Sequence, residues 1–302
     1  MIDLPSNEFL NRPGSIWEKY KFEGKPMAVI RREMEDTLLE SYVVPDDVHW
    51  EAGTCGGIRG KWIYPEKDES NGSFIYYIHG GGFTLGSSGV PLPFLCELAH
   101  RLNIPCFSVD YRLAPEYPFP AGLEDCVAVY EGLLEKGYSP EKMIVSGESA
   151  GGTLSLALVH HLKAAGKPIP KAVVSISPVV NATPGHSAAD ENGQVLAALP
   201  GVKEVMEMYA PGADLANPLI SPIRGNLTNF PPLFLIAGGA EGLLTESLDM
   251  ADACARAGGD VKLLIGRDMI HTYPLDFDDY PEAAEAFEEV VLFIRQKLKM
   301  SK

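Results

Sequence analysis

Ser149 lies at the centre of a G-x-S-x-G sequence whose flanking residues predict a sharp turn between a strand and a helix. Residues 142–146 predict a short buried strand, and residues 150–165 predict a helix. A strand that turns directly into a helix strains the backbone between them, and Gly147 and Gly151 lack the Cβ atoms that would collide there. The helix also directs the positive end of its dipole toward Ser149. The pattern favours a serine nucleophile over the simpler alternative, a Gly/Ser turn that caps a helix.

A second glycine-rich loop, H-G-G-G-F at residues 79–83, follows the predicted strand at residues 74–78. Consecutive glycines let the backbone approach a ligand closely and leave N–H groups that point toward it. This loop follows the third predicted strand and the serine turn follows the fifth, so the amides of Gly81, Gly82 and Ala150 are expected to form an oxyanion hole. A phosphate-binding loop is disfavoured because neither G-x-G-x-x-G nor G-x-x-x-x-G-K-[ST] occurs. A plain flexible turn is the remaining alternative.

The general base is found by elimination among the seven histidines. In the strand–serine–helix arrangement the chain order is Ser, then the acid, then His. Only His271 follows the last predicted strand, since three histidines precede Ser149 and His186 lies in a long irregular segment. His160 and His161 are adjacent on the predicted helix and are expected to form a pair on its surface. We therefore predict His271 as the base.

The acid of the predicted triad should follow the strand at residues 232–237. Glu241 occupies that position, in the sequence G-G-A-E-G-L-L. Asp268 is the rival, because it lies three residues before His271. A structural alternative is that Glu241 only favours the N-terminus of the next helix. The position of the loop favours Glu241 as the acid.

Alternating strands and helices make up most of the chain after residue 46. This alternation predicts an α/β fold with a mostly parallel central sheet that has helices on both faces. It is interrupted at residues 181–225, which contain one predicted helix and no clear strand. Strands are expected at 47–51, 58–64, 74–78, 104–109, 142–146, 171–176, 232–237 and 261–265, and helices at 91–102, 121–136, 150–165, 199–209, 243–257 and 281–299.

Composition limits the classes of partner. The 302-residue chain carries 25 Lys and Arg against 41 Asp and Glu, a formal charge of −16. Such a surface repels phosphate groups, so nucleic-acid and membrane partners are not expected and neutral substrates are favoured. The 5 cysteines have no C-x-x-C or zinc-type spacing, so reduced and mostly buried thiols are expected, with no metal or other cofactor. No signal peptide or run of 18 apolar residues is found, which predicts a cytoplasmic location.

Three motifs together resemble one protein family. They are H-G-G-G-F at 79–83, D-Y-R-L-A-P-E at 110–116 and G-E-S-A-G-G at 147–152. In this order they resemble the hormone-sensitive-lipase-like carboxylesterases of the α/β-hydrolase superfamily. Many members carry Asp where this chain has Glu241.

The resemblance implies a division of the chain and a role for each motif. An α/β-hydrolase core at 46–180 and 226–302 would be covered by a helical cap at 1–45 and 181–225. Ser149 would be the nucleophile, Gly81, Gly82 and Ala150 the oxyanion donors, and residues 110–116 a structural turn that shapes the pocket wall.

Residues and resemblance together predict a serine carboxylesterase. It would hydrolyse neutral esters of short to medium chain through Ser149, His271, Glu241 and an acyl-enzyme intermediate. Lactones are a second substrate class for the same chemistry. Two alternatives stay open, a non-catalytic small-molecule receptor on the same fold and a serine peptidase or amidase. The predicted partner is a small-molecule ester, and a homodimer is left open.

Overall fold

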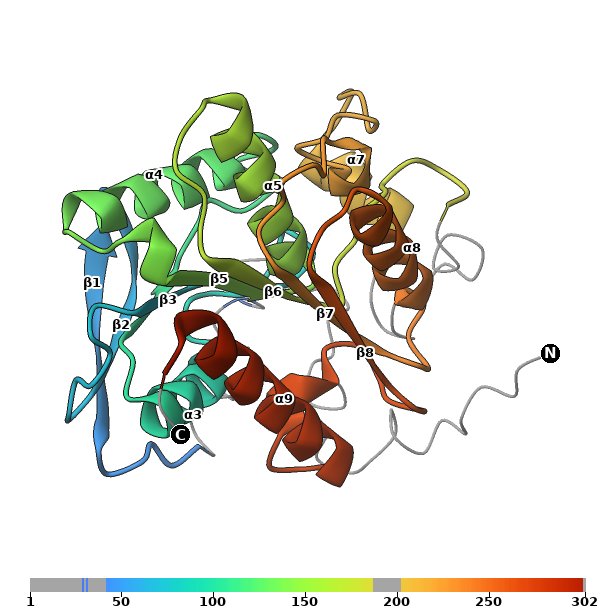
Figure 1. The fold of residues 1–302 in the computed structure, drawn as a ribbon. Coiled ribbons are helices and arrows are strands. Elements are labelled where there is room, and N and C mark those ends of the chain that lie inside the picture. Colours follow the sequence, from blue (N-terminus) through green and yellow to red (C-terminus); the bar gives the residue numbers. More distant parts are fainter. Residues whose placement is uncertain (1–28, 30, 32–41, 187–201, 301–302) are drawn as a thin grey trace.

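An eight-stranded sheet forms the centre of the protein (Figure 1). The computed structural model describes residues 29, 31, 42–186 and 202–300. The strand order is β1-β2-β4-β3-β5-β6-β7-β8; β1–β2 and β2–β4 are antiparallel and all other pairs are parallel. This confirms the predicted α/β class and the mostly parallel sheet. The strands are β1 (Val48–Cys55), β2 (Ile58–Pro65), β3 (Phe74–Ile78), β4 (Cys106–Val109), β5 (Met143–Glu148), β6 (Ala172–Ile176), β7 (Leu233–Gly238) and β8 (Val261–Gly266).

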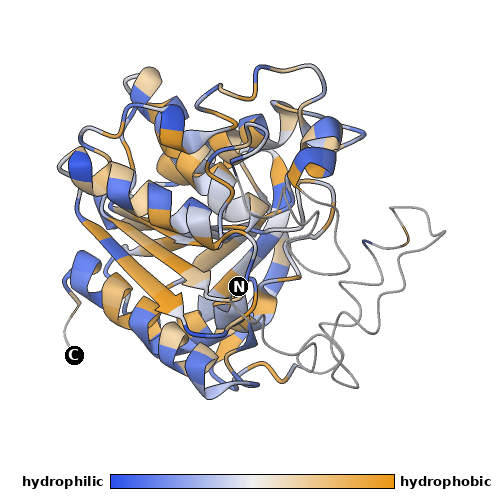
Figure 2. Ribbon diagram, turned by 90° about the vertical axis from the view of Figure 1, so that its right-hand side faces the viewer, coloured by the Kyte–Doolittle hydropathy of each residue, from blue (hydrophilic) through white to orange (hydrophobic). Residues whose placement is uncertain are grey.

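Helices cover both faces of the sheet. On one face lie α4 (Ala121–Glu135), α5 (Ala150–Ala164) and α8 (Leu244–Arg256); on the other lie α3 (Leu92–Leu102) and α9 (Pro281–Leu298) (Figure 1). Both faces are therefore buried, and alternate residues of β3 enter opposite cores, Tyr76 on the α4 side and Tyr77 on the α3 side. Figure 2 shows the resulting pattern, with largely apolar strands between helices that carry both apolar and polar residues. Short 3₁₀ helices occupy Pro140–Lys142, Pro222–Arg224 and Tyr273–Asp276.

The first strand is longer than the sequence predicts, since it continues to Cys55 rather than ending at residue 51. Gly56 and Gly57, with φ of 56° and 78°, form a two-residue turn that pairs Cys55 with Ile58. Positive φ at both positions matches the twist of a tight hairpin, so the hairpin extends the pairing through residues of low strand propensity. The other strand and helix boundaries lie within three residues of the predicted ones.

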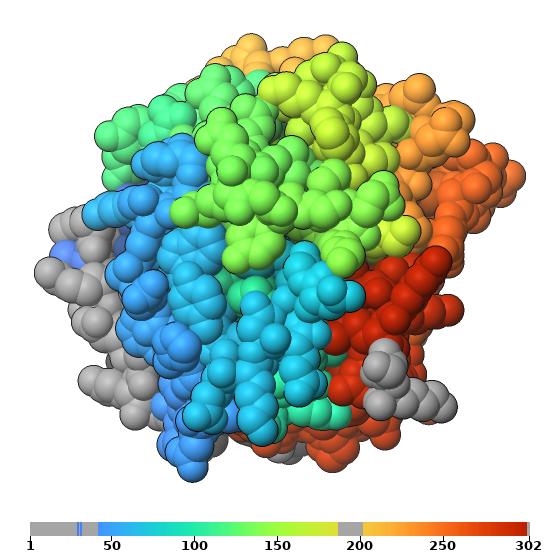
Figure 3. Space-filling view, turned by 60° about the vertical axis from the view of Figure 1, so that its left-hand side comes forward, coloured from blue at the N-terminus to red at the C-terminus, as the bar shows by residue number. Residues whose placement is uncertain are grey.

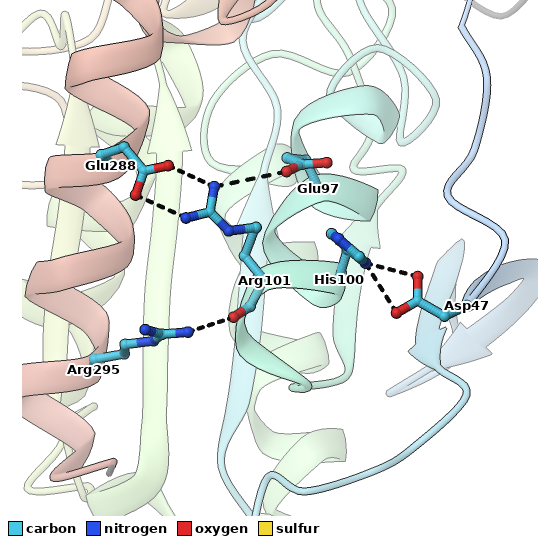
Figure 4. A network of polar contacts seen from close by, with 6 residues as sticks. All are labelled: Asp47, Glu97, His100, Arg101, Glu288 and Arg295. Carbon is cyan, nitrogen blue, oxygen red and sulfur yellow. Dashed lines mark hydrogen bonds and ion pairs between the residues drawn. The ribbon is translucent and has the colours of Figure 1, made fainter. Parts of the chain in front are cut away.

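Segments far apart in the sequence are packed together around the sheet edges. On the surface seen in Figure 3, the blue β1–β2 hairpin lies beside the green segment of α4 and its connection to β5. A Cβ on Gly132 of α4 would lie 2.3 Å from the amide nitrogen of Gly56, so only glycine allows this approach. On the other face of the sheet, Arg101 of α3 donates to both carboxylate oxygens of Glu288 on α9, at 2.5 and 2.8 Å (Figure 4). Arg295 of α9 donates to the carbonyl of Arg101.

The predicted cap segments are described only in part. Most of residues 1–45 and the range 187–201 lie outside the described residues. In the remainder of the 181–225 insertion, α7 (Val202–Tyr209) matches most of the helix predicted at 199–209. The ring of Tyr209 stacks on Phe83 at 3.8 Å between centroids, and Val205 lies beside Gly82. The insertion therefore packs directly on the glycine-rich loop.

Three further observations bear on the sequence predictions. All five cysteines are buried and free. Of the helices in the described ranges, none is both long and apolar enough to cross a membrane. No group of three or more His, Cys, Asp or Glu side chains within those ranges is placed to hold a metal ion.

Candidate active site

Ser149 lies at the junction of β5 and α5, at the edge of the sheet formed by the carboxyl ends of the parallel strands. Its φ of 52° and ψ of −122° are outside the regions that L-residues favour, and such strain is found mainly at functional sites. The amide of Ser149 donates to the carbonyl of Ile176 at 2.8 Å, which ties the turn to β6. A Cβ on Gly151 would lie 1.9 Å from the carbonyl oxygen of Ile78. The turn therefore requires a glycine there, as the sequence predicts.

His271 and Glu241 form a hydrogen-bonded chain with Ser149. His271 Nε2 lies 2.9 Å from Ser149 Oγ, and His271 Nδ1 lies 2.5 Å from Glu241 Oε2. The Glu241 side chain is fully buried, and its other oxygen accepts the amide of Gly238 at 3.1 Å. Because a carboxylate only accepts, Nδ1 carries the proton and Nε2 is left to accept from the serine hydroxyl. This arrangement prepares Nε2 to remove the proton of Ser149.

Hydrogen bonds between the loops after β6, β7 and β8 fix this chain of three residues. The amide of Ala240 donates to the carbonyl of Met269 at 3.0 Å, which joins the Glu241 loop to the His271 loop. The amide of Thr272 donates to Ser177 Oγ at 3.1 Å. Sequence reasoning missed Ser177, although its place directly after β6, at the carboxyl edge of the sheet, was a usable signal.

The glycine-rich loop follows β3 and therefore lies at the same edge of the sheet. Gly81 and Gly82 have φ of 107° and 58°, a conformation that favours glycine. No backbone hydrogen bond between described residues uses the N–H of Gly81, Gly82 or Ala150 as its donor, and Ala150 begins α5, where an amide has no helical partner. These amides are therefore available to an oxygen near Ser149 Oγ.

The D-Y-R-L-A-P-E motif at residues 110–116 contacts the glycine-rich loop and the segment after it. The Tyr111 hydroxyl donates to the carbonyl of His79 at 3.0 Å, and the two rings stack at 4.3 Å. Asp110 Oδ1 accepts the amide of Ser88 at 2.6 Å. These contacts agree with the structural role expected for this turn.

Two other candidates from the sequence lie apart from the chain of three residues. Asp268, the rival acid, is 69% exposed at its side chain and pairs with Arg267 rather than with His271. His160 was expected on a helix surface, and this was wrong: it is only 6% exposed and its Nε2 lies 2.8 Å from the carbonyl of Pro222. Burial lowers the pKa of His160 to about 4. The segment at 222–230 covers α5 there, which helical periodicity alone does not reveal.

Glu148 is a buried ionisable residue directly before Ser149, and sequence reasoning gave it no role. It is 4% exposed. Burial raises its pKa from 4.5 to about 7, although the nearby Tyr77 hydroxyl and the hydrogen bond from the amide of Gly80 oppose the shift. The sequence did contain a signal for its burial, because Glu148 is the first x of G-x-S-x-G and lies close to the end of a strand predicted to be buried.

Replacing Glu148 with Gln should change how stability depends on pH. The unfolded chain loses the Glu148 proton near pH 4.5 and the native protein near pH 7, so unfolding releases a proton between these values. The stabilising contribution is complete below about pH 4.5 and is lost as the pH rises through about 7, a change on the order of 2–4 kcal/mol. We therefore expect the melting temperature of Glu148→Gln, relative to wild type, to rise between pH 5 and pH 8 in thermal unfolding scans. A difference that is constant with pH would contradict this.

The family of this chain is established by comparison with known proteins. A family model described as the α/β-hydrolase fold matches residues 75–275. An acetyl-hydrolase of Streptomyces hygroscopicus is 31% identical over 281 residues, covering 92% of each chain. An esterase of Acinetobacter venetianus is 28% identical over 299 residues, covering 93% of this chain and 97% of its own.

Solved structures give the same result at the level of the fold. A crystal structure of an esterase from the bacterial hormone-sensitive lipase family matches with a TM-score of 0.85 and 32% identity, covering 94% of this chain and 95% of its own. A crystal structure of EstE5 soaked with p-nitrophenyl butyrate matches with a TM-score of 0.84 and 32% identity, covering 94% and 96%. The chain belongs to the α/β-hydrolase fold family, in the branch that resembles hormone-sensitive lipase.

Proposed function

We propose that this protein is a serine carboxylesterase in which Ser149, His271 and Glu241 are the catalytic triad. The observation that carries the proposal is the continuous hydrogen-bonded chain from the buried Glu241 through His271 to the Ser149 hydroxyl. A non-catalytic receptor has no need of a base oriented by a buried carboxylate and aimed at a strained serine. The names of the relatives, esterase and acetyl-hydrolase, support the same activity.

The reaction has two steps. His271 Nε2 takes the proton of Ser149 Oγ as the oxygen attacks the ester carbonyl, and the amides of Gly81, Gly82 and Ala150 stabilise the oxyanion. His271 then gives the proton to the leaving alcohol, which leaves an acyl group on Ser149. In the second step His271 activates water, which releases the acid. Glu241 accepts the hydrogen bond from the Nδ1–H group of His271 and stabilises the imidazolium in both steps.

The proposed substrates are neutral esters with short to medium acyl groups. The formal charge of −16 disfavours anionic substrates, which argues for neutral ones. Val205 and Tyr209 of α7 pack on the glycine-rich loop and limit the space on that side of Ser149. We assign α7 and the rest of the 181–225 insertion to a cap over the site. Lactones, whose reacting group is also a neutral ester, are the second substrate class.

A series of p-nitrophenyl esters tests the proposed function. The rate constant kcat/KM should be highest for acyl groups of about two to eight carbons, and should fall for longer chains because the cap limits the pocket. Rapid mixing should give a burst of nitrophenol equal to the enzyme concentration if deacylation is slower than acylation. Rates that rise toward emulsions of long-chain triglycerides would contradict the predicted chain-length preference, and an absence of hydrolysis of every ester would contradict the proposed function.

Peptidase activity is the second candidate, and a comparison of p-nitroanilides with the p-nitrophenyl esters tests it. Amide bonds demand closer placement of the leaving nitrogen, and no observation in the described residues favours a peptide-binding groove. Hydrolysis of p-nitroanilides at rates comparable with the esters would favour the peptidase.

A cytoplasmic location stays a prediction, supported by the five buried free thiols.

A further inference from the structure

The carboxyl group of Glu148 connects the serine turn to the glycine-rich loop. Glu148 Oε1 accepts a hydrogen bond from the amide of Gly80 at 2.6 Å, across 68 residues of sequence. The two segments are in close contact there, because a Cβ on Gly80 would lie 3.1 Å from Glu148 Oε1 and 3.1 Å from the Cβ of Ser149. Gly80 directly precedes Gly81 and Gly82. The direction of their amides therefore depends on how the peptide of Gly80 is held.

The surroundings of Glu148 do not explain its carboxyl group in any other way. The titratable groups that face it are the hydroxyls of Tyr77 on β3 and Tyr111 on the supporting turn, and His271 lies beyond Ser149. Burial, together with the nearby carboxyl, keeps both tyrosines neutral by raising their pKa values well above 10. No Lys or Arg among the described residues contributes to the shift of the Glu148 pKa. No ion pair with a described residue therefore offsets the cost of burying this carboxyl group, and the hydrogen bond to it comes from the amide of Gly80.

We propose that Glu148 is a positioning residue for ester hydrolysis, and that its side-chain oxygen fixes the Gly80 amide so that Gly81 and Gly82 point at the oxyanion. The inference rests on the proposed esterase function. Glu148 is not part of the proton relay, since Glu241 and His271 carry that role. It acts before the reaction, by removing the freedom of the loop to turn its amides away from the site.

The acceptor oxygen, rather than the charge, is the property that the loop requires. A neutral carboxyl group retains a carbonyl oxygen that accepts from an amide, as does the carboxamide of Gln. Met has nearly the same length and volume but offers no comparable acceptor. Glu148→Gln and Glu148→Met therefore separate the hydrogen bond from the packing of the side chain.

The test compares these two variants with Ser146→Ala, a matched control on the same strand whose buried hydroxyl has no hydrogen-bond partner in the described part of the chain. With p-nitrophenyl butyrate at pH 8, Glu148→Met should lower kcat by about 10–100-fold and leave KM nearly unchanged, because misdirected oxyanion donors affect the transition state more than substrate binding. Glu148→Gln should restore kcat to near the wild-type value. The rate of labelling by an organophosphonate, whose adduct also places an oxygen in the oxyanion hole, should follow kcat.

Each outcome decides the inference. A kcat of Glu148→Met equal to that of Ser146→Ala would overturn it, and so would a folded Glu148→Gln with a kcat as low as that of Glu148→Met. If Glu148→Met does not fold, Glu148→Gln decides alone, since a large loss of kcat in that variant contradicts the proposal and retention supports it. These results are distinct from failure of the proposed function, in which wild type itself would show no hydrolysis that depends on Ser149.

Discussion

Replacing Ser149 with alanine is expected to reduce kcat for ester hydrolysis by about 10⁶-fold, as loss of the triad serine does in a protease, and to leave only the residual catalysis from the oxyanion hole and binding. The reason is that Ser149 Oγ, 2.9 Å from His271 Nε2, supplies both the nucleophile and the acyl carrier. Alanine has the same backbone preferences as serine at φ 52°, so the turn should keep its conformation. Substrate affinity should therefore change little. Burst amplitude and steady-state rate with p-nitrophenyl butyrate are the measurements.

The control for this prediction is Ser155→Ala. Ser155 lies six residues after Ser149 on α5, and its buried hydroxyl donates to the carbonyl of Gly151 at 2.8 Å. This variant should retain the burst. An organophosphonate should add one label to wild type and to Ser155→Ala, and none to Ser149→Ala, by intact mass. Labelling at another residue, or a Ser149→Ala variant that keeps the burst, would show that a different nucleophile is used.

Replacing Glu241 with glutamine is expected to lower kcat by about 10⁴-fold, as the neutral isostere of the triad carboxylate does in a serine protease. The Glu241 carboxylate accepts from both Gly238 N and His271 Nδ1, whereas a carboxamide has a single acceptor oxygen. If that oxygen accepts from Gly238, the amide NH₂ faces His271 and favours the wrong tautomer. If it accepts from His271, the buried amide of Gly238 loses its partner. KM and the melting temperature should change much less than kcat.

Two companion variants test whether Glu241 is the acid. Glu241→Asp keeps the charge but is shorter by one methylene, so it should fall between wild type and Glu241→Gln in kcat. Asp268→Asn should have little effect, because Asp268 is exposed and pairs with Arg267. An inactive Asp268→Asn variant together with an active Glu241→Gln variant would mean that the acid is Asp268 and that the loop after β7 has only a structural role.

Most of the fold was predictable because its elements have strong local signals. Strands such as β3 and β7 are continuous apolar runs bounded by turn residues, which is typical of strands buried on both faces. The hairpin at Gly56 and Gly57 was less predictable, since its pairing extends β1 through residues of low strand propensity. The burial of His160 could not be predicted from local sequence, because it depends on a segment more than 60 residues away that hydrogen-bonds to it.

The sequence by itself determined the α/β class, the order of the elements and the candidate residues Ser149 and His271, and it favoured Glu241 with Asp268 as its rival. It did so because chain order limits which loops lie at the carboxyl edge of a parallel sheet. Only the tertiary structure decided between Glu241 and Asp268 as the partner of His271, since that choice depends on the direction of each side chain. It also revealed Glu148, whose contact with Gly80 spans 68 residues. Hydrogen bonds between loops depend on positions to within a fraction of an ångström, and those positions are set by the packing of the whole sheet.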